Sequence, residues 1–275
     1  MSRQIFGLDF SGAEKAGRLI WLAEARQTTT GIQTLSCRPA AELPGGAADR
    51  EKALGALRAF IATTPNAIFG CDFPFSLPGS LIAAKAWPDF LAAFDHADAG
   101  AFRQYCRART GGREPRRKTD EESKTPWCAF NIRLHRQTFH GLSGLLRPLV
   151  SQSKAAVLPM QKACADRPWI IETCPASTLA HLDCRVPYKG GKHRAKRGWI
   201  VERLIERARL VPLPAAIEST VLDNKGGDAL DSIIAALTTA HALQEIGAGA
   251  GGGDPLEGRV YFRIGRSCGL KSPDI

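Results

Sequence analysis

The sequence lacks any apolar run long enough to cross a membrane. Its longest apolar stretches, such as residues 232–240 and 155–159, are far shorter than the roughly 20 residues that a spanning helix needs. The first residues also lack the apolar core and small-residue cleavage site of a secretory signal. The sequence therefore predicts a cytoplasmic protein without a membrane partner.

Motifs built on cysteine, histidine or serine are also missing. The eight cysteines form no C-x-x-C pair, and the six histidines form no H-x-x-x-H or H-E-x-x-H pattern. Zinc ribbons, thioredoxin-like redox sites and zinc peptidases therefore find no support. No serine lies in a G-x-S-x-G elbow, which argues against a hydrolase triad.

What remains is an ordinary globular composition with a basic charge. The 275 residues are 44% hydrophobic and 23% charged, which suits one large or two small folded domains. Lysine and arginine number 37 against 27 for aspartate and glutamate, so the net charge is +10. This excess favours contact with polyanions, of which nucleic acid (DNA or RNA) is the commonest.

The hydrophobic pattern predicts an α/β protein whose elements come in a specific order. Strands are expected at residues 4–9, 18–25, 31–37, 66–72 and 169–173, and helices at 49–63, 88–107, 126–149, 199–210 and 227–246. Residues 258–264 are expected to form a late strand or a tail. This is the element order of an RNase H-like fold, a mixed five-stranded sheet of order 3-2-1-4-5 flanked by helices. Residues 1–72 and 168–265 would form the core, and residues 73–167 a helical insertion subdomain between strands 4 and 5.

Four aspartates are candidates for one metal site. Asp9 and Asp72 end the first and fourth strands, which lie side by side at the switch point of the predicted sheet. Asp228 and Asp231 are three residues apart and share one face of the late helix. Carboxylate oxygens are the ligands that Mg²⁺ or Mn²⁺ prefers, and a pair of such ions can hydrolyse phosphodiesters.

Each aspartate alone has a structural alternative. Asp9 and Asp72 could be turn residues and Asp228 a helix cap. Asp231 lies one turn inside an apolar helical stretch, where an unpaired charge is costly, so it needs a partner or a metal. Glu172 ends the fifth strand, and three roles stay open for it: binding metal, orienting water or only bonding the next loop.

Two basic, glycine-containing segments flank the aspartates in sequence. They are candidates for gripping a nucleic-acid backbone, although such charge runs are more often solvated loops. The candidate phosphate contacts are Arg113, Arg116, Arg117, Lys118, Lys189, Lys192, Arg194, Lys196 and Arg197.

Four motifs together resemble a known family. They are GLDFSGA at 7–13, FGCDFPFSLP at 69–78, IETCPA at 171–176 and DALDSIIAAL at 228–237. In order and spacing they are similar to the family of domains of unknown function numbered 429, described as predicted nucleases with an RNase H fold. The resemblance runs from about residue 5 to 262 and includes RKTD at 117–120 and EGRVY at 257–261.

The aspartate positions also resemble those of RuvC-like resolvases, whose acidic residues end the first and fourth strands and pair on a late helix. By that likeness Asp9 would bridge two Mg²⁺ or Mn²⁺ ions, Asp72 would hold one, and Asp228 with Asp231 the other. Asp72 stands where resolvases carry a glutamate, and the insertion is long, so junction cleavage is not implied.

We therefore expect a divalent-metal-dependent nuclease. One alternative is an ATP-dependent phosphotransferase of the sugar-kinase and actin type, which shares the fold, although a second glycine-rich phosphate loop is missing. The other alternative is a non-catalytic module that binds nucleic acid or a protein partner through the basic loops.

Overall fold

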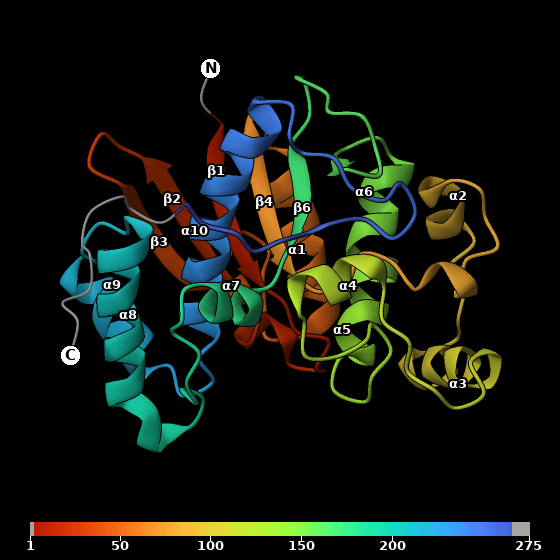
Figure 1. Ribbon diagram of the computed structural model, residues 1–275, viewed down its shortest axis with the longest axis horizontal. Helices are drawn as coiled ribbons and strands as arrows, with labels where there is room; N and C mark the ends of the chain where they lie inside the picture. Colours follow the sequence, from red (N-terminus) through yellow and green to blue (C-terminus); the bar gives the residue numbers. More distant parts are fainter. Residues whose placement is uncertain (1–2, 266–275) are drawn as a thin grey trace.

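The computed structural model describes residues 3–265, in which one mixed sheet lies between two layers of helices (Figure 1). The sheet has the order β3-β2-β1-β4-β6-β5, and β7 also pairs with β6. Its strands are β1 (Gln4–Asp9), β2 (Trp21–Gln27), β3 (Ile32–Pro39), β4 (Ala67–Asp72), β5 (Ala156–Leu158), β6 (Trp169–Thr173) and β7 (Val260–Tyr261).

Antiparallel pairing changes to parallel pairing at β1. This strand is antiparallel to β2 and parallel to β4, and β6 continues the parallel side. The mixed α/β class with flanking helices is confirmed, and the first three strands pair antiparallel in chain order. The prediction of five strands is wrong, because β5 and β7 extend the sheet beside β6. β5, at three residues, is too short to give a periodic signal, whereas β7 lies inside the late strand or tail expected at residues 258–264.

Ten α-helices surround the sheet in the described part of the chain. They are α1 (Arg50–Ala62), α2 (Trp87–Ala92), α3 (Ala99–Arg109), α4 (Lys118–Ser123), α5 (His135–His140), α6 (Arg147–Ser151), α7 (Pro175–His181), α8 (Arg194–Ala208), α9 (Ala215–Asp223) and α10 (Asp228–Gly247). A π-helical segment, Gly141–Leu146, joins α5 to α6. Single 3₁₀ turns cover Ala16–Arg18, Ala40–Glu42, Gly79–Leu81 and Gly191–His193. No helix among residues 3–265 combines the length and apolar character that crossing a membrane requires.

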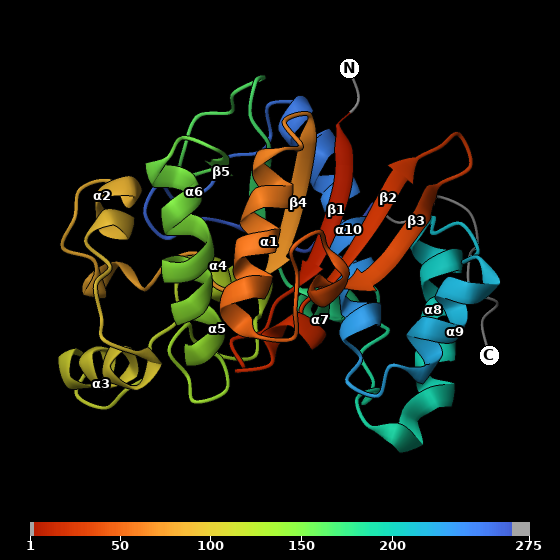
Figure 2. The ribbon, with the colours of Figure 1, turned by 180° about the vertical axis from the view of Figure 1, so that it is seen from behind.

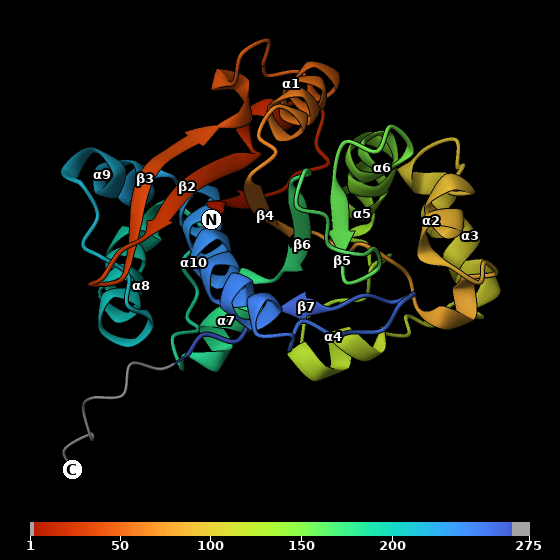
Figure 3. The same cartoon turned by 90° about the horizontal axis from the view of Figure 1, so that it is seen from above.

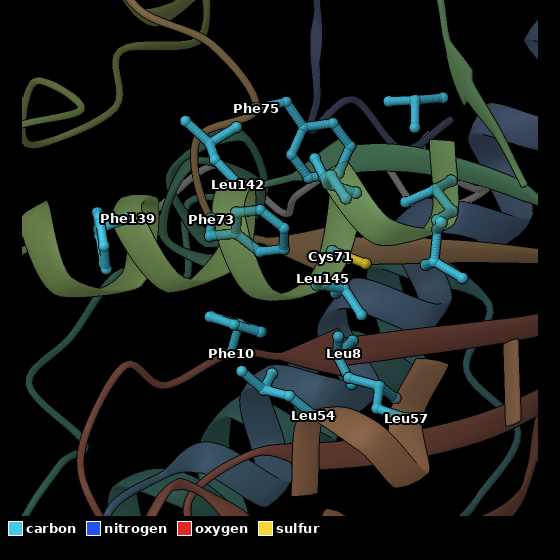
Figure 4. Packing of buried hydrophobic residues seen from close by; sticks show 14 of the residues in the cluster. Leu8, Phe10, Leu54, Leu57, Cys71, Phe73, Phe75, Phe139, Leu142 and Leu145 are labelled. Carbon is cyan, nitrogen blue, oxygen red and sulfur yellow. The ribbon is translucent and has the colours of Figure 1, made fainter. Parts of the chain in front are cut away.

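The helices cover the two faces of the sheet in separate groups. Helices α1, α5 and α6 lie on one face, while α8, α9 and α10 lie on the other (Figures 2 and 3). On the first face, Phe10, Leu54, Phe73 and Leu145 belong to one buried cluster (Figure 4). A second cluster joins the other face to α8 and α10. Each face therefore buries its own apolar core.

The segment from residue 73 to 167 is not purely helical. It contains α2 to α6, but it also supplies β5, which pairs with β6 at the edge of the sheet. Its buried residues Phe102 and Phe130 share one cluster with Leu8 and Leu54 of the preceding core. The insertion is therefore packed continuously with the sheet.

Two glycines allow α10 to lie directly on the sheet. A Cβ on Gly7 would stand 2.0 Å from the backbone nitrogen of Ala236, and one on Gly70 would stand 1.9 Å from Thr239 Oγ1. Only glycine accepts so close an approach. Because strand side chains alternate between faces, Asp9 and Asp72, two residues further on, point to the same face as these glycines. The close packing of α10 therefore positions the strand-end carboxylates against that helix.

Candidate active site

Asp9 and Asp72 are register partners at the carboxyl ends of β1 and β4. These ends lie side by side in Figure 2. The Asp9 side chain is buried, with 6% of the residue exposed, and Asp72 is partly exposed. Neighbouring parallel strands are about 4.8 Å apart, so the two carboxylates share one small region at the switch point of the sheet.

The first turn of α10 adds two further carboxylates. Asp231 is buried and Asp228 partly so. Both lie at the helix N-terminus, where the helix dipole favours negative charge. Tyr188 Oη donates a hydrogen bond of 2.5 Å to Asp231 Oδ1, and Lys189 Nζ lies 2.8 Å from Oδ2. Asp231 therefore has the partners that its place in an apolar stretch requires.

The carboxylates act on one another electrostatically. Burial, followed by the charge of Asp231, raises the pKa of Asp9 well above its usual range. The same two causes raise the pKa of Asp72 to about 8, and burial also raises the pKa of Asp228. The Asp231 carboxylate raises the pKa of Lys189, so this lysine stays charged. With all four carboxyls ionised, the site would hold more negative charge than one ammonium group neutralises, and this repulsion favours protonation of Asp9 and Asp72.

The chemistry of this donor set suits a hard divalent cation, because every donor is a carboxylate oxygen and the charges are in excess. Within residues 3–265, however, no group of three or more His, Cys, Asp and Glu side chains is arranged to hold a metal ion. Instead, the Lys189 ammonium group occupies one side of Asp231. A cation at Asp231 would therefore compete with Lys189 for this carboxylate.

Glu172 is held by an internal ion pair. Arg117 Nη1 and Nη2 donate to its two carboxylate oxygens at 2.8 and 2.5 Å, and the backbone N–H of Phe75 donates to Oε2 at 2.9 Å. Burial raises the pKa of Glu172, and Arg117 opposes this shift. Of the three roles left open by the sequence, these contacts favour the structural one.

Two of the proposed phosphate contacts are inside the protein. Arg117 is 0% exposed and pairs with Glu172 and Asp120, and Arg197 is 1% exposed. Arg197 donates to the backbone carbonyls of Tyr188 and Leu222 and fixes the loop that carries Lys189. Neither guanidinium group is available to a nucleic-acid backbone, so this part of the prediction is wrong.

The other proposed contacts remain on the surface. The Lys189 side chain is 56% exposed, but its ammonium group is paired with Asp231. Lys118 lies 3.5 Å from Asp254, and Arg194 is paired with Asp223. The remaining exposed cations of this set are Arg113, Arg116, Lys192 and Lys196.

The sequence did not indicate that Tyr188 and Lys189 meet Asp231. More than forty residues separate them from that aspartate, and Arg197, which donates to the carbonyl of Tyr188, supports the loop that makes the contact. A single sequence carries no signal for such a tertiary contact.

Comparisons of the chain with protein-family models, curated proteins and solved structures found no match. The resemblance to the family numbered 429 therefore stays a prediction.

Proposed function

We propose that this protein is a divalent-metal-dependent phosphodiesterase that acts on nucleic acid. The observation that carries the proposal is the gathering of four carboxylates, from three distant segments, at the ends of β1 and β4 and the start of α10. The order β3-β2-β1-β4-β6, with β2 antiparallel to β1, supports an RNase H-like assignment.

Each part of the site has a distinct role in this proposal. Asp9 and Asp72 would present oxygens from the sheet, and Asp228 with Asp231 from the helix. Mg²⁺ or Mn²⁺ bound there would supply an activated water and stabilise the leaving oxygen. Lys189 keeps Asp231 neutralised before a cation binds, and Tyr188 holds that carboxylate in place. The exposed cations on the loop before α8 and on α8 would seat the phosphate backbone.

The test uses Asp9→Asn, with Asp223→Asn as the matched control. Asp223 is an exposed aspartate paired with Arg194, outside the cluster. In chelator, Asp9→Asn should unfold at a higher temperature than the wild type, because it removes a buried ionisable carboxyl whose charge burial and Asp231 disfavour in the folded state. With Mn²⁺ at 100 times its Kd, the wild type and the control should gain about 2.7 kcal/mol of stability and Asp9→Asn much less.

Cleavage of labelled DNA and RNA is measured on the same samples. We expect the wild type and the Asp223→Asn control to cleave in the presence of Mn²⁺, and Asp9→Asn to lose this cleavage. Stabilisation by ATP would instead favour the phosphotransferase. Nucleic-acid binding that chelation leaves unchanged, without cleavage at any metal concentration, would favour the non-catalytic module.

A further inference from the structure

A pocket of about 110 Å³ opens directly beside Asp72, between the end of β6 and the segment from α4 to α5. Its volume is well below the roughly 300–1,000 Å³ of sites that take a whole small molecule. The pocket therefore suits one part of a larger substrate that continues onto the carboxylate cluster.

The walls of the pocket are largely apolar. Pro74, Pro126, Trp127 and Leu134 line it. Trp127 is 37% exposed, and the Arg133 guanidinium stacks over its ring at 4.7 Å. Such an aromatic wall suits the face of a planar ring.

The charges at the base of the pocket exclude a phosphate. Arg117 uses all five of its guanidinium N–H groups, on Asp120, on Glu172 and on the carbonyl of Glu257. It therefore has no donor left for an anion. Two buried carboxylates face this one cation, so the local charge is negative and a phosphate would be repelled.

The polar atoms left over are mainly acceptors. Glu172 Oε1 and Asp120 Oδ1 each accept one bond from Arg117 and keep a further lone pair. Gln137 also lines the pocket; its Nε2 donates to the carbonyl of Phe10, and its Oε1 can only accept a hydrogen bond. Thr173, which is 1% exposed, also lines the pocket, and its Oγ1 has no partner in the described part of the chain.

We propose that this pocket binds a nucleobase that carries an exocyclic amino group, next to the phosphate presented to Asp72. The inference rests on the proposed function and adds a base preference to it. An amino group finds acceptors in the pocket, whereas a carbonyl at the same ring position would face carboxylate oxygens. Cytosine and thymine provide the sharpest comparison, because N4 of cytosine is a donor where O4 of thymine is an acceptor.

The experiment measures fluorescence anisotropy of labelled oligo(dC) and oligo(dT) of equal length in chelator, with the corresponding RNA oligomers in parallel. The wild type should bind oligo(dC) about tenfold more tightly than oligo(dT). Trp127→Ala should weaken oligo(dC) binding about 5- to 150-fold through lost stacking. Thr173→Val removes an unpartnered hydroxyl, so it should keep the wild-type unfolding temperature and weaken oligo(dC) binding about fivefold.

Trp199→Ala is the matched control. Trp199 is also 37% exposed and stacked by an arginine, but it lies on α8 and does not line the pocket. It should leave the ratio of oligo(dC) to oligo(dT) affinity unchanged. Equal binding of the two oligomers by the wild type, or an unchanged ratio in Trp127→Ala, would overturn the base pocket and leave nucleic-acid binding standing. Failure of the wild type to bind any oligomer would overturn the proposed function along with it.

Discussion

Arg117 shows how tertiary pairing decides the role of a single charged residue. In sequence it lies in a run of basic residues, which normally indicates a solvated surface. In the structure it is buried between Asp120 and Glu172, with every donor used. The pairing partner Glu172 is 55 residues away, so the sequence pattern alone could not reveal the burial.

Glu172→Gln tests whether this residue is structural or a metal ligand. The change keeps the shape of the side chain but leaves the buried Arg117 charge partly uncompensated, so the free energy of unfolding should fall by about 3–5 kcal/mol. Urea denaturation measures it. Glu121→Gln, an exposed glutamate on α4, is the control and should stay within about 0.5 kcal/mol of the wild type. Wild-type stability combined with weakened Mn²⁺ binding would instead make Glu172 a metal ligand.

Among the elements, some long patterned segments could be predicted from the sequence, and short ones could not. The single helices expected at 88–107 and 126–149 are wrong: the first is divided into α2 and α3, and the second is helical only from α5 through the π-helical segment to α6. The helix behind Asp49 forms as α1, and Asp49 accepts a hydrogen bond from the Lys52 N–H as an N-cap. The strands ending at Asp9 and Asp72 and the 20-residue α10 were also predicted. Helices α4, α7 and α9 were missed, since six to nine residues give little periodicity.

Gly7→Ala tests whether close packing of α10 on the sheet positions the site. The new methyl group would meet the backbone nitrogen of Ala236, which cannot move aside without displacing the helix. We expect a loss of about 3 kcal/mol in urea denaturation and weaker Mn²⁺ binding, because Asp231 moves with α10. Gly55→Ala in α1 is the control: it meets only the flexible end of Arg58 and should gain about 0.5–1 kcal/mol. A Gly7→Ala variant as stable as the wild type would contradict this account.

At the scale of the whole molecule, the carboxylate cluster lies between two segments that are basic in sequence. The loop holding Lys189 touches Asp231, and the segment around Arg117 touches Glu172 at the end of β6. The sequence could place the aspartates, because strand ends and a helix turn follow from periodicity. It could not distinguish exposed cations from buried ones, because this depends on which loop folds over which strand.

With a net charge of +10, the nucleic-acid binding proposed above should be sensitive to salt, and the exposed lysines near α8 should account for part of that sensitivity. Replacing Lys192 and Lys196 with Gln should reduce the slope of log K against log salt by about 0.9 per lost phosphate contact on duplex DNA. Anisotropy titrations over a range of KCl concentrations measure the slope. Lys154→Gln is the control, because it precedes β5 at the amino edge of the parallel strands, opposite Asp72. The wild type, the double variant and Lys154→Gln could all give the same slope. The loop before α8 would then not contact phosphates, and the phosphate contacts would have to come from Arg113 and Arg116 on the other side of the cluster.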